Sequence, residues 1–207
     1  MAEITAQAVN EFRKATGLGL MECKALLKEA DGDLKKALTL AKEKHGKNAE
    51  NRAGRVTKAG RVEVYIHHDG KSGALIEVNC ETDFVARNEE FRQLAKDLAV
   101  QVVAAMPICV RREEVPAELV EEQRKIFLGQ VADKPEAVRE KIAEGKLNAW
   151  YEEKVLLDQK FVKDSAKSIQ EMIVATNART GENISVSRFA RFVVGEGNAP
   201  AADAAAE

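Results

Sequence analysis

A change in hydrophobic period near the middle of the chain constrains the fold more than any other feature of the sequence. In residues 74–78 every second position is apolar, which is the pattern of a strand with one buried face. In residues 91–102 apolar side chains instead recur at every third or fourth position, as they do along an amphipathic helix. Residues 79–88 must therefore connect a strand to a helix.

This connection is short and polar, and its large apolar side chains are adjacent to one another. Phe84 and Val85 stand between Asp83 and Arg87. An aromatic residue on a tight strand-to-helix connection either fills the core or is presented to a partner as a contact. The pattern leaves both alternatives open for Phe84.

Residues 1–47 predict a small module of three helices. Thr5 is a suitable N-cap for the first helix. Glycines at positions 17 and 19 separate it from the second helix, and the turn at 31–33 separates the second from the third. A bundle of this size is near the lower limit of independent stability and has little depth for a catalytic pocket. We therefore expect a binding module.

The next part of the chain predicts an antiparallel sheet. Residues 48–60, rich in Lys, Arg, Ala and Gly, are expected to form a partly helical linker. Residues 62–66 alternate like residues 74–78, and the turn residues between them predict a hairpin. Residues 184–194 alternate in the same way, and they can only be stable as a third strand on that hairpin.

Helical patterns fill the rest of the chain, at 88–106, in segments opened by Pro116 and Pro135, and at 165–178. Asn88 is the expected N-cap of the first of these helices. The predicted fold class is α+β, with a three-helix module at 1–47, a linker at 48–60, and a helical core with a three-stranded antiparallel sheet at 61–195. The tail at 196–207 is nearly all Gly, Ala, Pro and acidic residues, so it is expected to be disordered.

The charge balance and the cysteines argue against several classes of protein. Lys+Arg total 32 and Asp+Glu total 34, a formal net charge of -2, so no direct nucleic-acid partner is expected. Cys23, Cys80 and Cys109 are far apart and form no Cys-x-x-Cys pair, which argues against a zinc site or a disulfide framework. Neither a signal peptide nor a membrane-spanning apolar run is found. We therefore expect a cytoplasmic protein with no membrane partner.

Three motifs that suggest a ligand or catalytic site have simpler interpretations. The Gly-Lys-Ser sequence at 70–72 is similar to the end of a phosphate-binding P-loop, but Tyr65 stands where that motif needs glycine. His67 and His68 point to opposite faces of a strand and cannot easily share one metal. Cys80 has no histidine near it in sequence to activate it, so a packed thiol is the simpler interpretation.

Three stretches together carry a resemblance to a known family. Thr82-Asp83-Phe84-Val85, with its flanks at 77–81 and 86–88, resembles the signature loop of bacterial elongation factor Ts. Residues 11–24 resemble the first helix and following loop of that family, which belong to a UBA-like helical module. A third match, Gly181-Glu182-Asn183-Ile184, leads into the last predicted strand. The matches run in the family's order from about residue 4 to residue 195.

The resemblance implies a translation elongation factor that is not an enzyme. Members of this family bind elongation factor Tu in its GDP form and act as guanine-nucleotide exchange factors, so that GTP replaces the released GDP. Carried onto this chain, Asp83 and Phe84 are implied to enter the GTPase near its magnesium and phosphate sites. Thr82 and Val85 are implied to shape the loop. If Phe84 is this contact, its ring must be exposed in the free protein.

The resemblance also implies a second contact and an assembly. Arg13, Leu20 and Met21 match positions where the N-terminal module touches the nucleotide-binding domain of the partner; Leu20 stands where many members carry Met, which is a volume-conserving change. No cofactor and no metal of its own are implied. Longer members contain two related core halves, whereas this chain has room for one, so we expect a homodimer in a complex of two factors with two GTPases.

Two other functions are considered beside this one. The first is a UBA-like binding adaptor without exchange activity, which would depend on the N-terminal module alone. The second is an enzyme built around Cys80 or Cys109. The first predicts that binding needs only the module, and the second predicts that activity needs a cysteine.

Overall fold

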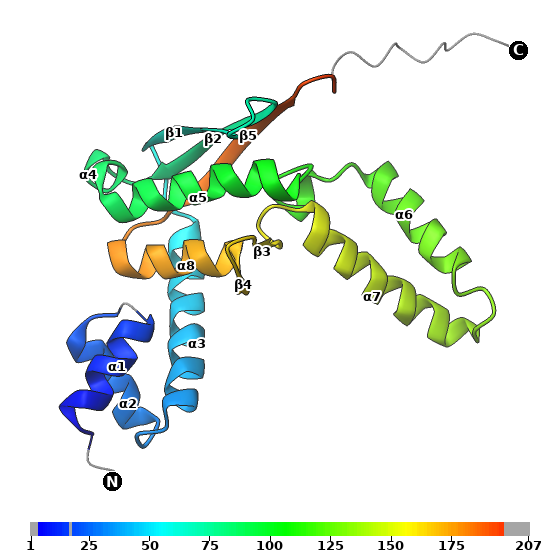
Figure 1. The fold of residues 1–207 in the computed structure, drawn as a ribbon. Helices are drawn as coiled ribbons and strands as arrows, with labels where there is room; N and C mark the ends of the chain where they lie inside the picture. The colour runs from blue at the N-terminus through cyan, green and yellow to red at the C-terminus, as the bar shows by residue number, and fades with distance from the viewer. Residues whose placement is uncertain (1–3, 17, 197–207) are drawn as a thin grey trace, which may run out of the picture. The chain divides into compact units, whose positions relative to one another are not determined.

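The computed structural model describes residues 4–16 and 18–196 (Figure 1). The chain forms two compact units that interleave along the sequence, so each is described by itself. The first comprises Met1–Gly60, Asn79–Arg92 and Glu171–Ser185, and the second comprises Arg61–Val78, Gln93–Gln170 and Val186–Glu207.

Three helices open the first unit: α1 (Ala6–Thr16), α2 (Leu20–Glu29) and α3 (Leu34–Ala53). Their core is a cluster around Phe12, Cys23, Leu26 and Leu27, which are at most 1% exposed. The predicted N-cap is confirmed, because Thr5 Oγ1 accepts a hydrogen bond from the Ala8 backbone N at 3.2 Å. The three helices are consistent with a UBA-like module.

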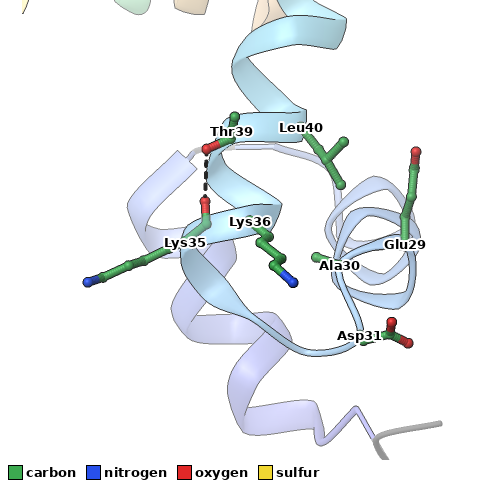
Figure 2. Close-up of a pocket in the computed structure, with 7 residues that line it drawn as sticks. All are labelled: Glu29, Ala30, Asp31, Lys35, Lys36, Thr39 and Leu40. Atoms are coloured by element: carbon green, nitrogen blue, oxygen red, sulfur yellow. Dashed lines mark hydrogen bonds between the residues drawn. The ribbon is translucent and has the colours of Figure 1, made fainter.

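The turn between α2 and α3 is closed by a second cap. Asp33 Oδ1 accepts hydrogen bonds from the backbone N of Lys35 at 2.8 Å and of Lys36 at 3.2 Å, and these bonds lower the pKa of the Asp33 carboxyl below its ordinary value. Figure 2 shows the hollow of about 390 Å³ beside this turn, whose rim carries Glu29 and both lysines. Its lining also includes the buried Ala30 and the half-buried Leu40.

The remaining elements confirm the predicted α+β class. The strands β1 (Ala59–Ile66), β2 (Ser72–Cys80) and β5 (Ser185–Val193) form a three-stranded antiparallel sheet in the order β1-β2-β5 (Figure 1). A two-stranded sheet pairs β3 (Lys160–Phe161) with β4 (Asp164–Ser168). The other helices are α4 (Asp83–Arg87), α5 (Glu89–Ala105), the 3-10 helix Arg112–Glu114, α6 (Ala117–Gly129), α7 (Glu136–Lys154) and α8 (Ile169–Thr180).

The alternation of β2 is buried as predicted, but that of β1 is not. Ala74, Ile76 and Val78 are at most 3% exposed, so one face of β2 belongs to the core. On β1 the apolar residues at 62, 64 and 66 are all more than half exposed, whereas Glu63 is buried and pairs with Arg61 Nε at 2.7 Å. An alternating strand has two faces, and the pattern alone does not say which of them is covered.

Helix α3 continues to Ala53, so the first part of the predicted linker is helical, as expected. One element boundary differs from the prediction. The segment predicted as a helix from residue 165 begins as strand β4, and α8 starts only at Ile169. The reason is pairing with β3, since Lys160 lies opposite Ser168 and the buried Gln101 side chain donates to the Lys160 carbonyl at 3.0 Å. The predicted domain boundaries themselves stay a prediction, and the tail beyond residue 196 lies outside the described residues.

Candidate functional site

The site is the turn that joins β2 to α5, and it is a short helix of its own. Helix α4 begins after Thr82, whose Oγ1 accepts a hydrogen bond from the Val85 backbone N at 3.4 Å. Val85 and Ala86 are 4% and 8% exposed and fasten the helix to the core. Phe84 points the other way and is 82% exposed. The ring of Phe84 therefore does not fill the core, and its expected exposure is confirmed.

The surface around Phe84 is charged on both sides. A hollow of about 570 Å³ beside the ring is lined by Asp83, Phe84, Arg87, Asn88 and Glu89. Asn88 Oδ1 accepts from the Glu90 backbone N at 2.8 Å, which confirms the predicted N-cap of α5. A bulky aromatic side chain between a carboxylate and a guanidinium has the chemistry of a protein contact with a polar rim.

Two glutamates hold the chain at the start of this turn. Glu182 Oε2 accepts hydrogen bonds from the backbone N of Glu81 and of Thr82, both at 3.1 Å, and its Oε1 accepts from Thr82 Oγ1 at 2.5 Å. In return, Glu81 Oε1 accepts from the Asn183 backbone N at 2.7 Å. Each carboxylate thus accepts from backbone N–H groups of the segment that carries the other, about a hundred residues away in sequence.

Further contacts attach the end of α3 and the end of α8 to the same place. Arg55 Nη1 lies 3.4 Å from Glu81 Oε1, and the Arg55 carbonyl accepts from Asn183 Nδ2 at 3.2 Å. On the far side of the turn, Arg179 of α8 forms an ion pair at 3.3 Å with Glu90 at the start of α5. The Phe84 turn is therefore fixed at both of its ends.

Cys80 lies directly under the turn and is completely buried. Its Sγ donates to the Thr82 carbonyl at 3.2 Å. Burial and the nearby negative charge of Glu182 raise the pKa of the Cys80 thiol to about 11. Burial and the Glu114 carboxylate likewise raise the pKa of Cys109 to about 11. Neither thiol has the lowered pKa that an activated nucleophile needs.

The residues predicted on the N-terminal module are all at its surface. Leu20 and Met21 stand side by side at the start of α2 and are 51% and 77% exposed. Arg13 is exposed on α1. Exposed apolar side chains at a helix start are free to contact a partner, so the structure leaves the predicted role of these three residues available.

The residues that hold the turn are not predicted from the sequence. The match at 181–184 implies no role for Glu182 or Asn183, and Glu81 is only a flank of the signature loop. The available signal was weak: an acidic residue immediately before the turn and another after a distant helix. Nothing in sequence spacing says that the two carboxylates meet.

Within the described residues, no helix is long and apolar enough to cross a membrane. In the same part of the chain, no group of three or more His, Cys, Asp or Glu side chains is arranged to hold a metal ion.

Comparison with known proteins identifies the family. The family model for Elongation factor TS matches residues 2–196. Elongation factor Ts of Thermotoga maritima is 47% identical over 195 residues, which cover 94% of this chain and 98% of that protein. Elongation factor Ts of Geobacter sulfurreducens is 51% identical over 196 residues, covering 94% and 91%, and that of Finegoldia magna is 48% identical over 207 residues, covering 95% and 92%. The chain therefore belongs to the elongation factor Ts family of translation elongation factors.

Proposed function

We propose that this protein is a guanine-nucleotide exchange factor that binds elongation factor Tu in its GDP form and promotes GDP release in the cytoplasm. The observation that carries the proposal is the 82% exposure of Phe84, on a turn that matches the signature loop of the family. Such exposure of a large aromatic ring costs solvation free energy in the free protein. A binding partner that covers the ring recovers it.

The mechanism follows from how magnesium holds a nucleotide. Magnesium requires oxygen ligands in near-ideal octahedral geometry, so a small displacement of a coordinating loop weakens its hold on GDP. Phe84 would enter the GTPase beside this loop, and Asp83 would bring a carboxylate to the same region. Thr82 and Val85 keep the turn in shape, one as the N-cap and the other as a buried anchor.

The proposed action is a coupling of two binding equilibria and needs no covalent step by this protein. If the factor weakens GDP binding, GDP must weaken binding of the factor by the same ratio. The protein then acts without a cofactor and is not an enzyme in its own right. Arg13, Leu20 and Met21 would add a second contact that increases affinity.

Release of a fluorescent GDP analogue from purified elongation factor Tu tests the proposal directly. We expect the release rate to rise with the concentration of this protein and then to saturate. A UBA-like adaptor would instead bind the GTPase and leave the release rate unchanged. Binding measured in parallel by titration calorimetry separates that outcome from a simple failure to interact.

We also propose that the protein is a homodimer, in a complex of two factors with two GTPases. The open face of the β1-β2-β5 sheet in the second unit supports this, since it carries six exposed apolar side chains, and all of them except Val62 line a hollow of about 420 Å³. They are Val62, Val64, Ile66, Leu75, Phe192 and Val194. A contiguous apolar sheet face of this kind is normally covered, and a second copy offers an identical face with which to form a symmetric sheet-on-sheet contact. Light scattering over a range of concentrations measures the molecular mass and so distinguishes a dimer from a monomer.

A further inference from the structure

Several side-chain hydrogen bonds converge on the start of the Phe84 turn. Thr82 alone makes three of these hydrogen bonds. Its backbone N and its Oγ1 donate to Glu182, and its carbonyl accepts from Cys80 Sγ. A helix of five residues such as α4 has almost no stability of its own, because helix nucleation is unfavourable. The conformation of the turn therefore depends on these side-chain contacts together with the burial of Val85 and Ala86.

Glu182 and Glu81 together form a carboxylate clamp, which we define as these two side chains and the backbone groups they accept from. Without Glu182 the backbone N of Glu81 and of Thr82 would lose their acceptor, and the Thr82 hydroxyl would lose its partner. Without Glu81 the backbone N of Asn183 would lose its acceptor. Each carboxylate therefore secures the segment that carries the other.

We propose that Glu182, with Glu81, is a positioning residue that holds the 82–85 turn in the conformation that presents Phe84 to the GTPase. This inference rests on the proposed exchange function. The clamp acts through Phe84 and does not itself touch the partner. If only a fraction of the free molecules hold the turn correctly, apparent binding and exchange fall by that fraction.

Charge is not the property that the clamp requires of Glu182, since its bonding partners are two backbone N–H groups and a hydroxyl. A glutamine at this position keeps one oxygen for the two N–H groups, and its amide can donate to the Thr82 hydroxyl, which accepts as well as donates. Alanine keeps none of these bonds. The pair Glu182→Gln and Glu182→Ala therefore separates hydrogen bonding from charge.

The first measurement is GDP release from elongation factor Tu with these variants. We expect Glu182→Ala to reduce the stimulated release rate by at least about fivefold, as the loss of three hydrogen bonds predicts, and Glu182→Gln to stay within about twofold of the parent. Glu140→Ala is the matched control, because it removes an exposed carboxylate outside the turn, one that forms an ion pair with Arg124 at 2.8 Å. This control should leave the rate unchanged.

A double-mutant cycle then asks whether Glu182 acts through Phe84. Once Phe84 is replaced by alanine, adding Glu182→Ala should cause little further loss, because a correctly held turn no longer presents a ring. Additive losses would mean that Glu182 contacts the partner or serves another step, and would overturn the proposal. A loss with Glu182→Gln as large as with Glu182→Ala would overturn it too.

A second measurement on the free protein does not depend on exchange at all. Cys80 is buried under the turn and Cys23 is buried in the core of the N-terminal module, so alkylation read by peptide mass spectrometry reports local opening at the first and global opening at the second. We expect Glu182→Ala to increase labelling of Cys80 relative to Cys23 at least about fivefold over Glu182→Gln. Both substitutions remove the same charge from beside the thiol, so the difference between them reports opening of the turn.

The outcomes of the two measurements are distinguishable. If the parent protein does not stimulate GDP release, the proposed function fails, while Cys80 labelling still decides whether the clamp holds the turn. If Glu182→Ala labels Cys80 no faster than Glu182→Gln does, the clamp is refuted even where release has slowed. Should Glu182→Ala not fold, Thr82→Val removes the hydroxyl that bonds to Oε1 and is expected to show the same excess labelling of Cys80 on a smaller scale.

Discussion

Replacing Phe84 by alanine separates the contribution of the ring to function from its contribution to folding. Its side chain is 82% exposed in the free protein, so the substitution removes very few packing contacts. Surface substitutions of this kind usually change the free energy of unfolding by less than about 0.5 kcal/mol. We therefore expect Phe84→Ala to fold like the parent, with the same midpoint in a urea titration.

The effect on exchange should be much larger, because nearly the whole ring is available to a partner. A buried Phe covers about 150–250 Å², so an 82% exposed ring can bury roughly 120–200 Å² on binding. At about 25 cal/mol per Å² this gives roughly 3–5 kcal/mol, an upper bound because alanine keeps its Cβ and ordering the contact costs entropy. If only about 1.4 kcal/mol of it lowers the barrier to GDP release, the variant is tenfold slower.

Stopped-flow release of a fluorescent GDP analogue from elongation factor Tu measures this rate, with the factor varied to saturation. We expect a maximal stimulated rate at least about tenfold below that of the parent. Val162→Ala is the control, since it also shortens an exposed apolar side chain, 46% exposed, but outside the turn. Equal stimulated rates for the parent and Phe84→Ala would refute the proposed entry of the Phe84 ring into the GTPase and with it the role that the resemblance implies for this loop.

Three further outcomes are expected. Met21 is 77% exposed, and Met21→Ala should raise the factor concentration needed for half-maximal GDP release severalfold. The maximal rate should be almost unchanged, since the substitution would lower affinity and leave the Phe84 turn intact. Val64→Lys places a charge on the open sheet face, where this residue is 54% exposed; light scattering should find a monomer, and an unchanged dimer would show that another surface joins the copies. The pKa of Cys80 is raised to about 11 from an ordinary 9.0. The stabilisation of the folded protein that follows from this shift is fully present below pH 9 and is lost as the pH rises toward 11. Urea titrations at pH 8 and pH 10 should therefore show the parent losing roughly 1 kcal/mol more than Cys80→Ala does, and equal losses would mean that this thiol does not titrate late.

The change of hydrophobic period predicted the location of the connection between β2 and α5 well, because that signal is local. Strand β2 ends at Cys80 and α5 begins at Glu89, close to where the alternating and helical patterns end and begin. What the pattern did not predict is that part of the connection is itself helical, over Asp83–Arg87. Five residues carry too little periodicity to be distinguished from a turn.

The open face of the sheet shows a second limit of sequence patterns. Alternation at residues 62–66 correctly predicted a strand, but it did not say that Val62, Val64 and Ile66 would face solvent while Glu63 lies buried beside Arg61. Which face is covered depends on the elements packed against the strand. If the proposed dimer forms, these apolar residues are buried in the assembly, and the alternation describes a core that one chain alone does not complete.

The carboxylate clamp is the part of the site that local patterns could not supply. Glu81 and Glu182 are about a hundred residues apart, and the geometry that joins them is made by β2, α8 and the start of β5 together. Glutamate is among the commonest surface residues, so its presence at either position carries almost no information by itself. In the proposed exchange function the exposed Phe84 ring must also be held in one orientation, because ordering an unheld ring on a five-residue helix would cost part of its binding free energy. We therefore expect the exposed Phe84 ring and the half-buried Glu182 carboxylate that holds its turn to act together, and a variant that keeps Phe84 but loses the clamp should behave as if it had lost part of the ring.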